Sequence, residues 1–181
     1  MVEAKNINWE KISAALPYKD DPDSVQRRKK IWSGIDVNNN GFVSLAEIDK
    51  GLRDILQLDH VFNCKRAIFQ AFKSAKSSAK SKSVHGPDYV ERKEFKTLLY
   101  YLRQYFEYFQ AFARADTGDD NRIDLEEFKR FETTLEKWVG KIDDPVAEFK
   151  KIDKNGGGQI TFDEFVAWAQ HRSLDLDDDD N

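Results

Sequence analysis

Oxygen donors recur at a regular spacing between Asp36 and Glu47. Positions one, three, five, seven and twelve of this stretch could each supply a donor, the seventh through its backbone carbonyl: Asp36, Asn38, Asn40, Phe42 and Glu47. Gly41 at position six allows a turn with positive φ, and Ser44 at position nine can hold a bridging water. This set suits Ca²⁺, a hard cation that takes 6–8 oxygens at about 2.3–2.6 Å. The alternative is a solvated Asn-rich turn, but the filled key positions favour a calcium-binding loop.

A second stretch of this kind begins at Asp116. Carboxylates stand at its positions one, five, nine and twelve: Asp116, Asp120, Asp124 and Glu127. Gly118 removes the donor expected at position three, where a water could bind instead. Asn121 replaces the turn glycine, and Arg122 offers only its carbonyl. Because four carboxylates in one short loop repel one another unless a cation neutralises them, we expect calcium here too.

A third stretch runs from Asp153 to Glu164. Its donors are the side chains at positions one, three and twelve and the carbonyl at position seven: Asp153, Asn155, Glu164 and Gln159. Gly158 is the turn glycine, and Thr161 can position a water. Gly157 leaves position five without a side-chain donor. Ordering three consecutive glycines costs backbone entropy, so we expect calcium binding weaker than in an ideal loop.

The chain also contains the remnant of a fourth loop. Glu94-Phe95 repeats the Glu-Phe step that closes the two later loops. Counting back from Glu94 places Ser83, His85 and Pro87 at positions one, three and five, and these make no plausible calcium set. We therefore expect this loop to be structural and metal-free, which limits the protein to three calcium ions.

A twelve-residue calcium loop between two helices is the EF-hand unit, and such units pack in pairs. The sequence thus predicts an all-α fold of two EF-hand pairs with the second loop degenerate. Paired loops form a short two-stranded β-bridge at position eight. We expect Val43 to face Val90 and Ile123 to face Ile160.

Four segments follow from this arrangement: an N-terminal extension with a short extra helix over 1–20, EF-hand pairs over 21–104 and 105–172, and an acidic disordered tail over 173–181. No glycine or proline interrupts Glu91 to Ala115. The exit helix of the second hand is therefore expected to continue as the entry helix of the third. The entry helix of the second hand is expected over 59–73.

Helix boundaries and inward faces follow from caps and apolar spacing. Asp23 or Ser24 is expected to cap the entry helix of the first hand, and Asp143 or Asp144 with Pro145 to begin that of the last. Apolar spacing in the second entry helix points four side chains inward: Val61, Ile68, Phe69 and Phe72.

Composition narrows the classes of protein. The chain has 181 residues, is 40% apolar and 34% charged, and has a formal net charge of −4. A single cysteine, Cys64, favours a reducing intracellular or cytoplasmic setting. No apolar run approaches the ~18 residues of a membrane span. His60, His85 and His171 define no zinc or catalytic constellation, so we expect no enzymatic activity. We also expect a monomer that binds no nucleic acid.

Two further segments bear on partners. Lys73 to Ser83 holds the four lysines Lys73, Lys76, Lys80 and Lys82 and five serines. The part from Lys73 to Lys82 could attract an anionic membrane surface, but a flexible solvated insertion is the simpler interpretation. Seven aromatic residues crowd the stretch between Tyr100 and Phe112. They cover more than one helix face, so some could line a groove for a protein target.

The chain resembles the calflagins, flagellar calcium-binding proteins of trypanosomatids, over about residues 7–170. The resemblance rests on the segments Trp9–Pro17, Gln26–Arg28, Leu135–Trp138 and Phe162–Phe165, on the inserted second hand, and on Trp168. It implies a calcium-responsive flagellar protein with metal in the third and fourth hands. Calflagins reach the membrane through an acylated N-terminus. Met1-Val2-Glu3 lacks the glycine and cysteine for acylation, so anchoring is not carried over.

Three functions remain open from the sequence. The first is a calcium sensor that changes shape and binds a protein or membrane partner. The second is a calcium buffer resembling sarcoplasmic calcium-binding proteins. The third, a calcium-triggered photoprotein, needs a cavity lined by His, Tyr and Trp and is disfavoured by the scattered histidines. Met1 is the only methionine, which argues against a Met-rich calmodulin-like groove.

Overall fold

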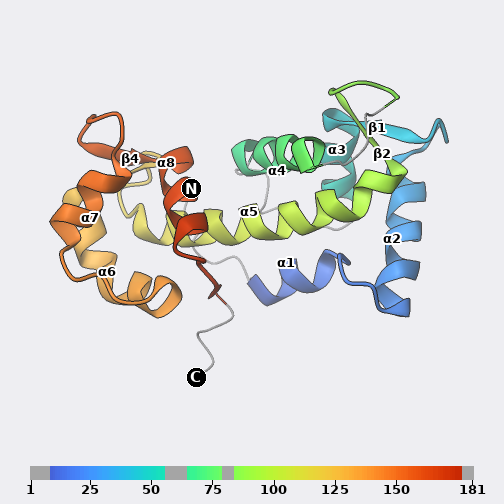
Figure 1. The fold of residues 1–181 in the computed structure, drawn as a ribbon. Helices are drawn as coiled ribbons and strands as arrows, with labels where there is room; N and C mark the ends of the chain where they lie inside the picture. Colours follow the sequence, from blue (N-terminus) through green and yellow to red (C-terminus); the bar gives the residue numbers. More distant parts are fainter. Residues whose placement is uncertain (1–8, 56–64, 79–83, 177–181) are drawn as a thin grey trace. The chain divides into compact units, whose positions relative to one another are not determined.

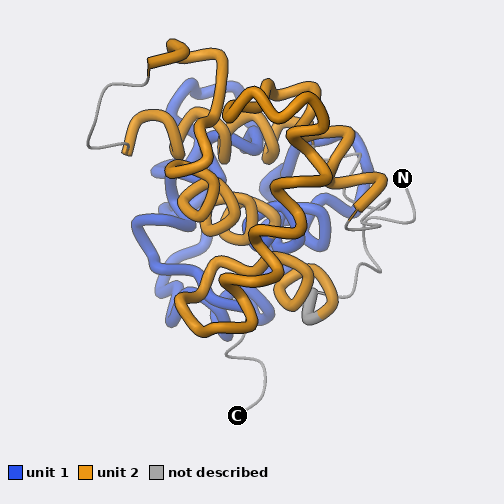
Figure 2. The backbone as a smooth tube through the Cα atoms, turned by 90° about the vertical axis from the view of Figure 1, so that its right-hand side faces the viewer, with its two compact units in different colours: residues 1–7, 107–181 blue, residues 8–106 orange. Residues whose placement is uncertain are grey.

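Helix-loop-helix units make up most of the chain (Figure 1). The structure is a computed structural model that describes residues 9–55, 65–78 and 84–176. The described chain divides into two compact units, one ending at Phe106 and the other beginning at Glu107 (Figure 2). Among the described helices, none is both long and apolar enough to cross a bilayer. The predicted all-α fold of EF-hand pairs is confirmed.

The first unit holds the extra helix and the first two hands. Its elements are α1 (Trp9–Ala15), α2 (Pro22–Ile35), β1 (Phe42–Ser44), α3 (Leu45–Asp54), α4 (Lys65–Ser78), β2 (Tyr89–Glu91), the 3₁₀ turn η3 (Arg92–Glu94) and the first part of α5 (Phe95–Ala115). β1 and β2 are antiparallel, with Val43 opposite Val90 as predicted. Both valines are fully buried, so the bridge lies inside the core of the pair.

The second unit holds the last two hands. Its elements are the remainder of α5, β3 (Arg122–Asp124), α6 (Leu125–Val139), α7 (Pro145–Ile152), β4 (Gln159–Thr161) and α8 (Phe162–His171). β3 and β4 are antiparallel, and Ile123 lies opposite Ile160 as predicted. The core beneath them is aromatic, and Phe128 and Phe165 are fully buried there.

Helix boundaries agree with the expected ones where local chemistry decides them. α5 runs unbroken from Phe95 to Ala115, as the absence of glycine and proline predicted. Asp144 caps α7, with Pro145 at the first helical position. The prediction for α2 was wrong, because Asp21 caps it by accepting the Ser24 backbone N–H at 2.8 Å. Pro22 then takes the first position, where its missing N–H costs nothing.

Two further expectations need correction. Phe69 faces outward from α4 and is 51% exposed, whereas Ile68 and Phe72 are buried. Residues 73–78 form the last turns of α4 instead of a flexible insertion. Val61, Cys64 and His60 lie outside the described residues.

The predicted disorder of the tail does not extend to residues 173–176. Leu174 and Leu176 are each 5% exposed. The Leu176 backbone N–H donates to a carboxylate oxygen of Glu107 at 2.8 Å, and the Asp175 N–H donates to the Trp138 carbonyl at 3.2 Å. Two apolar side chains among the aspartates therefore attach this segment to the second unit, because their burial removes apolar surface from water.

Candidate metal centres

Each of the three candidate loops is organised by the aspartate at position one. This aspartate follows the entry helix, and its carboxylate accepts the backbone N–H groups of positions five and six. The N···O distances are 3.0 and 3.1 Å for Asn40 and Gly41 to Asp36, 3.3 and 2.9 Å for Asp120 and Asn121 to Asp116, and 3.0 and 2.8 Å for Gly157 and Gly158 to Asp153. The same bonds recur in three loops whose other residues differ, so in each loop the first aspartate bends the backbone around its own carboxylate.

The loops also share their backbone turns. Positions four and six have positive φ in all three: 53° and 86° at Asn39 and Gly41, 56° and 65° at Asp119 and Asn121, and 68° and 77° at Gly156 and Gly158. Asn121 therefore adopts the conformation that glycine provides in the other two loops, as the sequence predicted. Asparagine tolerates this region better than most residues, so the turn is kept at small cost.

Side chains at positions three and five direct their oxygens into the turn. In the first loop, Asn38 Oδ1 accepts the Asn40 N–H at 3.0 Å, and Asn40 Oδ1 accepts the Phe42 N–H at 3.1 Å. In the Asp153 loop, Asn155 Oδ1 accepts the Gly157 N–H at 2.8 Å. In the Asp116 loop, Asp120 Oδ1 accepts the Arg122 N–H at 2.9 Å. The two later loops thus keep one of these contacts each, as their glycines at positions five and three require.

The carbonyl donors at position seven begin the bridge strands. Phe42 pairs with Glu91, Arg122 with Thr161, and Gln159 with Asp124. The Arg122 side chain is exposed, in keeping with a role for its carbonyl alone. Because the strands fix the peptide planes, the position of each carbonyl depends on the neighbouring loop.

The glutamate at position twelve lies in the first turn of the exit helix. Glu47, Glu127 and Glu164 are the third residues of α3, α6 and α8. Each carboxylate accepts the backbone N–H of position nine, at 2.8, 3.0 and 2.9 Å respectively. The side chain at position nine caps the helix in return, which completes a capping box. A cation that recruits this glutamate therefore acts directly on the start of a helix.

In the Asp116 loop, which has no side-chain donor at position three, Glu127 packs against the backbone of that position. The Gly118 N–H donates to Glu127 Oε1 at 2.7 Å, and the Thr117 hydroxyl lies 3.0 Å from the same oxygen. A Cβ on residue 118 would stand 3.2 Å from that oxygen, so glycine permits this close approach. Burial raises the pKa of Asp116, and the charges of Asp120 and Glu127 raise it further. This loop concentrates negative charge that a cation would relieve.

The chemistry of the donors fits calcium better than a transition metal. In the described parts of the chain, no three His, Cys, Asp or Glu side chains converge into a metal cluster. The loops instead combine carboxylate, amide and carbonyl oxygens, the hard ligands that Ca²⁺ prefers.

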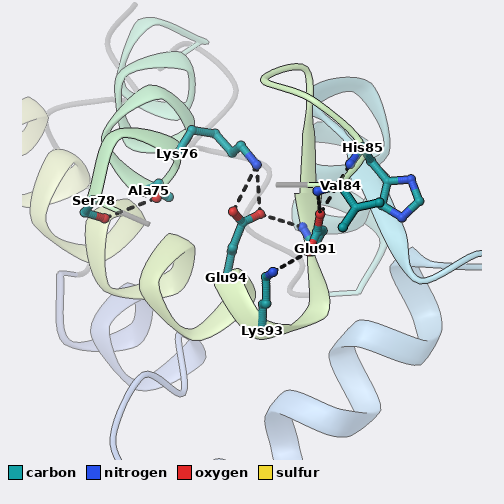
Figure 3. Close-up of polar contacts among 8 residues, drawn as sticks. All are labelled: Ala75, Lys76, Ser78, Val84, His85, Glu91, Lys93 and Glu94. Atoms are coloured by element: carbon teal, nitrogen blue, oxygen red, sulfur yellow. Dashed lines mark hydrogen bonds and ion pairs between the residues drawn. The ribbon is translucent and has the colours of Figure 1, made fainter. Parts of the chain in front are cut away.

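The second loop is built differently. His85 and Pro87 are exposed, and Glu94 at position twelve is only 4% exposed and pairs with Lys76 (Figure 3). The sequence analysis missed this pair. Its members are 18 positions apart on different helices, so no local pattern joins them.

Comparison with known proteins agrees with these loops. The FCaBP EF-hand domain family matches residues 12–102, and the EF-hand domain pair family matches residues 106–170. The helix-loop-helix fold and the geometry of the loops identify the chain as an EF-hand calcium-binding protein. The chain belongs more particularly to the flagellar calcium-binding proteins, the calflagins.

Two relatives carry this assignment. The flagellar calcium-binding protein of Trypanosoma cruzi is 37% identical over 173 residues, which cover 94% of this chain and 82% of the relative. The flagellar calcium-binding protein TB-1.7G of Trypanosoma brucei brucei is 35% identical over 183 residues, 98% and 80% of the two chains.

Solved structures are more distant. A homolog of programmed cell death 6 protein from Leishmania major Friedlin is 16% identical with a TM-score of 0.43, covering 88% of this chain and 79% of that one. Calcium-loaded apo-aequorin from Aequorea victoria is 20% identical with a TM-score of 0.30, covering 84% and 90%.

Proposed function

We propose that this protein is a calcium sensor with three calcium sites, in the Asp36, Asp116 and Asp153 loops. In this proposal the loops use the five, four and four residues named from the sequence: Asp36, Asn38, Asn40, Phe42 and Glu47; Asp116, Asp120, Arg122 and Glu127; and Asp153, Asn155, Gln159 and Glu164. The repeated loop geometry supports this assignment. Calcium bound there would neutralise the negative charges of the carboxylates.

One observation carries the sensor proposal. In the second unit, each position-twelve glutamate directly precedes a fully buried aromatic residue, Phe128 after Glu127 and Phe165 after Glu164. The Phe128 ring lies 5.9 Å from that of Phe149, and the Phe165 ring lies 5.5 Å from that of Phe112. A glutamate that shifts toward calcium must therefore move a core aromatic. The expected result is exposure of apolar surface to a partner.

The small number of acidic ligands favours moderate calcium affinity, so the occupancy of the sites would change during a calcium pulse. The first loop has two acidic ligands, Asp36 and Glu47, and the last loop likewise has Asp153 and Glu164. Such loops suit the sensor range of about 10⁻⁷ to 10⁻⁵ M, in which resting calcium leaves sites unfilled. A buffer would instead be filled at rest and would change shape little.

The test compares apolar exposure with and without calcium. A hydrophobic dye and the intrinsic tryptophan fluorescence are followed in calcium and in chelator, with magnesium present in both. We expect dye fluorescence to rise with calcium in the wild type and to stay low in an E127Q/E164Q variant. If calorimetry shows bound calcium while neither signal changes, the protein is a buffer. Visible absorbance of the purified protein tests the remote photoprotein alternative.

We infer a protein target in preference to an anionic membrane. Within residues 73–78 the structure pairs Lys76 with Glu94 and leaves Lys73 exposed. One exposed lysine in this described part is worth only about 1 kcal/mol at an anionic surface, while Lys80 and Lys82 lie outside the described residues. Because the relatives are named flagellar proteins, we place the target in the flagellum. Cosedimentation with phosphatidylserine vesicles and imaging of the tagged protein test these two inferences.

A further inference from the structure

A lysine neutralises Glu94, the carboxylate at position twelve of the second loop, which is the position of the bidentate metal ligand in a calcium-binding EF-hand. Lys76, near the end of α4, places its Nζ 3.0 and 2.9 Å from the two carboxylate oxygens of Glu94 (Figure 3). The two side chains are 11% and 4% exposed. We propose that the Lys76 ammonium stands in for calcium in this hand and thereby holds the first loop in its calcium-binding conformation. Lys76 is then a positioning residue for calcium at Asp36–Glu47.

The paired carboxylate organises the second loop. Glu94 Oε2 also accepts the backbone N–H of Glu91 at 2.8 Å. Glu91 Oε1 in turn accepts the Val84 N–H at 2.6 Å, and its Oε2 lies 3.0 Å from the Lys93 Nζ (Figure 3). The loop is therefore closed by ammonium groups and hydrogen bonds. Such a network in a poorly solvated site rigidifies the backbone when its members are satisfied.

The second loop holds the first through β2 and two rings. β2 pairs with β1, so Glu91 is the register partner of Phe42. His85 stacks on the Phe42 ring with centroids 4.0 Å apart, and Tyr89 meets the same ring edge-on at 5.0 Å. The carbonyl of Phe42 is the proposed position-seven donor of the first loop. Glu91, His85 and Tyr89 of the second hand thus position the Phe42 carbonyl, a proposed calcium ligand of the first hand.

The second unit has no counterpart of this arrangement among its described residues. Glu127 accepts from the Thr117 hydroxyl and from the backbone N–H groups of Gly118 and Asp124. Glu164 accepts from the backbone N–H groups and the side chains of Asn155 and Thr161, so all of these donor groups are uncharged. Both of these loops therefore need calcium to neutralise their last ligand. The first loop instead pairs with the second loop, in which the Lys76 ammonium already neutralises the glutamate at position twelve. Binding at the first loop then needs no second calcium ion to order its neighbour.

The inference rests on the proposed calcium site at the first loop, and the test separates the two. All variants are made in an E127Q/E164Q background, so that calcium binding reports the first loop. K76M removes the ammonium and leaves a buried carboxylate without its cation. K73M, an exposed lysine on the same helix, is the matched control. We expect K76M to weaken calcium binding about tenfold, within the usual 5–150-fold range of coupling, and K73M to leave it unchanged.

A second variant and a second readout keep the result clear if K76M folds poorly. K76M/E94Q removes both charges, and we expect the same weakening from it. In chelator, backbone amides of β1 and β2 should exchange faster in this variant than in the K73M control. Wild-type affinity and exchange in folded K76M/E94Q would overturn the role of Lys76. Failure of the background protein to bind any calcium would contradict the site at Asp36–Glu47, while the exchange comparison would still decide the role of Lys76.

Discussion

At the residue scale, the last ligand of each proposed calcium site is a glutamate in the first turn of an exit helix. The carboxylates of Glu47, Glu127 and Glu164 already accept hydrogen bonds from the loop and from the helix cap. A bidentate carboxylate is also the strongest ligand that each loop offers. In the proposed sites, the same side chain would therefore contribute to calcium affinity and to the orientation of the exit helix.

Replacing Glu47 by Gln should remove one calcium ion from the protein. The amide has the same shape but no charge, and it offers one oxygen where the carboxylate offers two. We expect calorimetry to count one ion fewer at free calcium up to about 10⁻⁴ M, which is about tenfold above the upper edge of the sensor range. Exchanging the exposed Glu126 for Gln provides the control and should leave the count unchanged. An unaltered count in the Glu47 variant would show that this loop is not a site.

At the element scale, a carboxylate ties α7 to α8. Glu148 Oε1 accepts the Trp168 indole N–H at 2.8 Å, and its Oε2 lies 3.1 Å from the Lys151 Nζ. Burial raises the pKa of Glu148, but these hydrogen bonds and the charges of Lys151 and Arg172 outweigh it and lower the pKa below its ordinary value. The ionised form is therefore the one that stabilises the folded unit.

The E148Q variant should lose about 1–2 kcal/mol of stability at pH 7, since hydrogen bonds to charged groups contribute about 1.5–3 kcal/mol and the amide keeps part of them. A lowered folded pKa means that this contribution is complete above the unfolded pKa and disappears as pH falls through the folded pKa. Urea unfolding in chelator should thus show a difference at pH 7 that shrinks as the pH falls below the ordinary range of a glutamate pKa. E126Q, at an exposed site, should unfold like the wild type. A difference that persists unchanged in acid would contradict the ionic origin.

The bridge between β3 and β4 should couple the two loops of the second unit. Ile123 and Ile160 pair across it, so ordering one loop lowers the entropy cost of ordering the other. In an E127Q variant, calcium binding to the Asp153 loop should weaken by 1–3 kcal/mol, which is about 5–150-fold. Calcium titration followed by the intrinsic tryptophan fluorescence, to which Trp168 on the exit helix of the Asp153 loop contributes, measures this, with E126Q as the control. Equal affinity in the two variants would mean that the loops act independently.

The features that could be predicted from the sequence are those formed by residues close together in the chain. Loop ligands lie within twelve positions of one another, so their spacing also predicted the register of both bridges. Lys76 and Glu94 lie on different elements and meet only through packing, so no sequence periodicity predicts their ion pair. Phe69 followed the apolar rule and still faces outward, because α4 buries its alanines, such as Ala67 and Ala71, and leaves Phe69 outside that face. The buried Leu174 and Leu176 were masked by the acidic composition around them.

At the scale of the whole molecule, the proposed calcium loops of the two units have different neighbours. The first unit holds one complete loop beside a loop closed by Lys76 and Glu94, and the second holds two loops with uncharged partners at position twelve. The first unit should therefore behave as a single independent site. The second should fill as a coupled pair.

The full protein should accordingly bind three calcium ions in two classes. Calorimetric titration of metal-free protein should fit one independent site plus two positively coupled sites. E47Q should leave only the coupled pair, because the first loop loses its twelfth ligand. E127Q/E164Q should leave a single non-cooperative site, because the remaining loop has no partner that binds metal. A fourth ion bound specifically, or cooperativity that survives in the E127Q/E164Q protein, would show that the second loop takes part in binding and that Lys76 does not replace its metal.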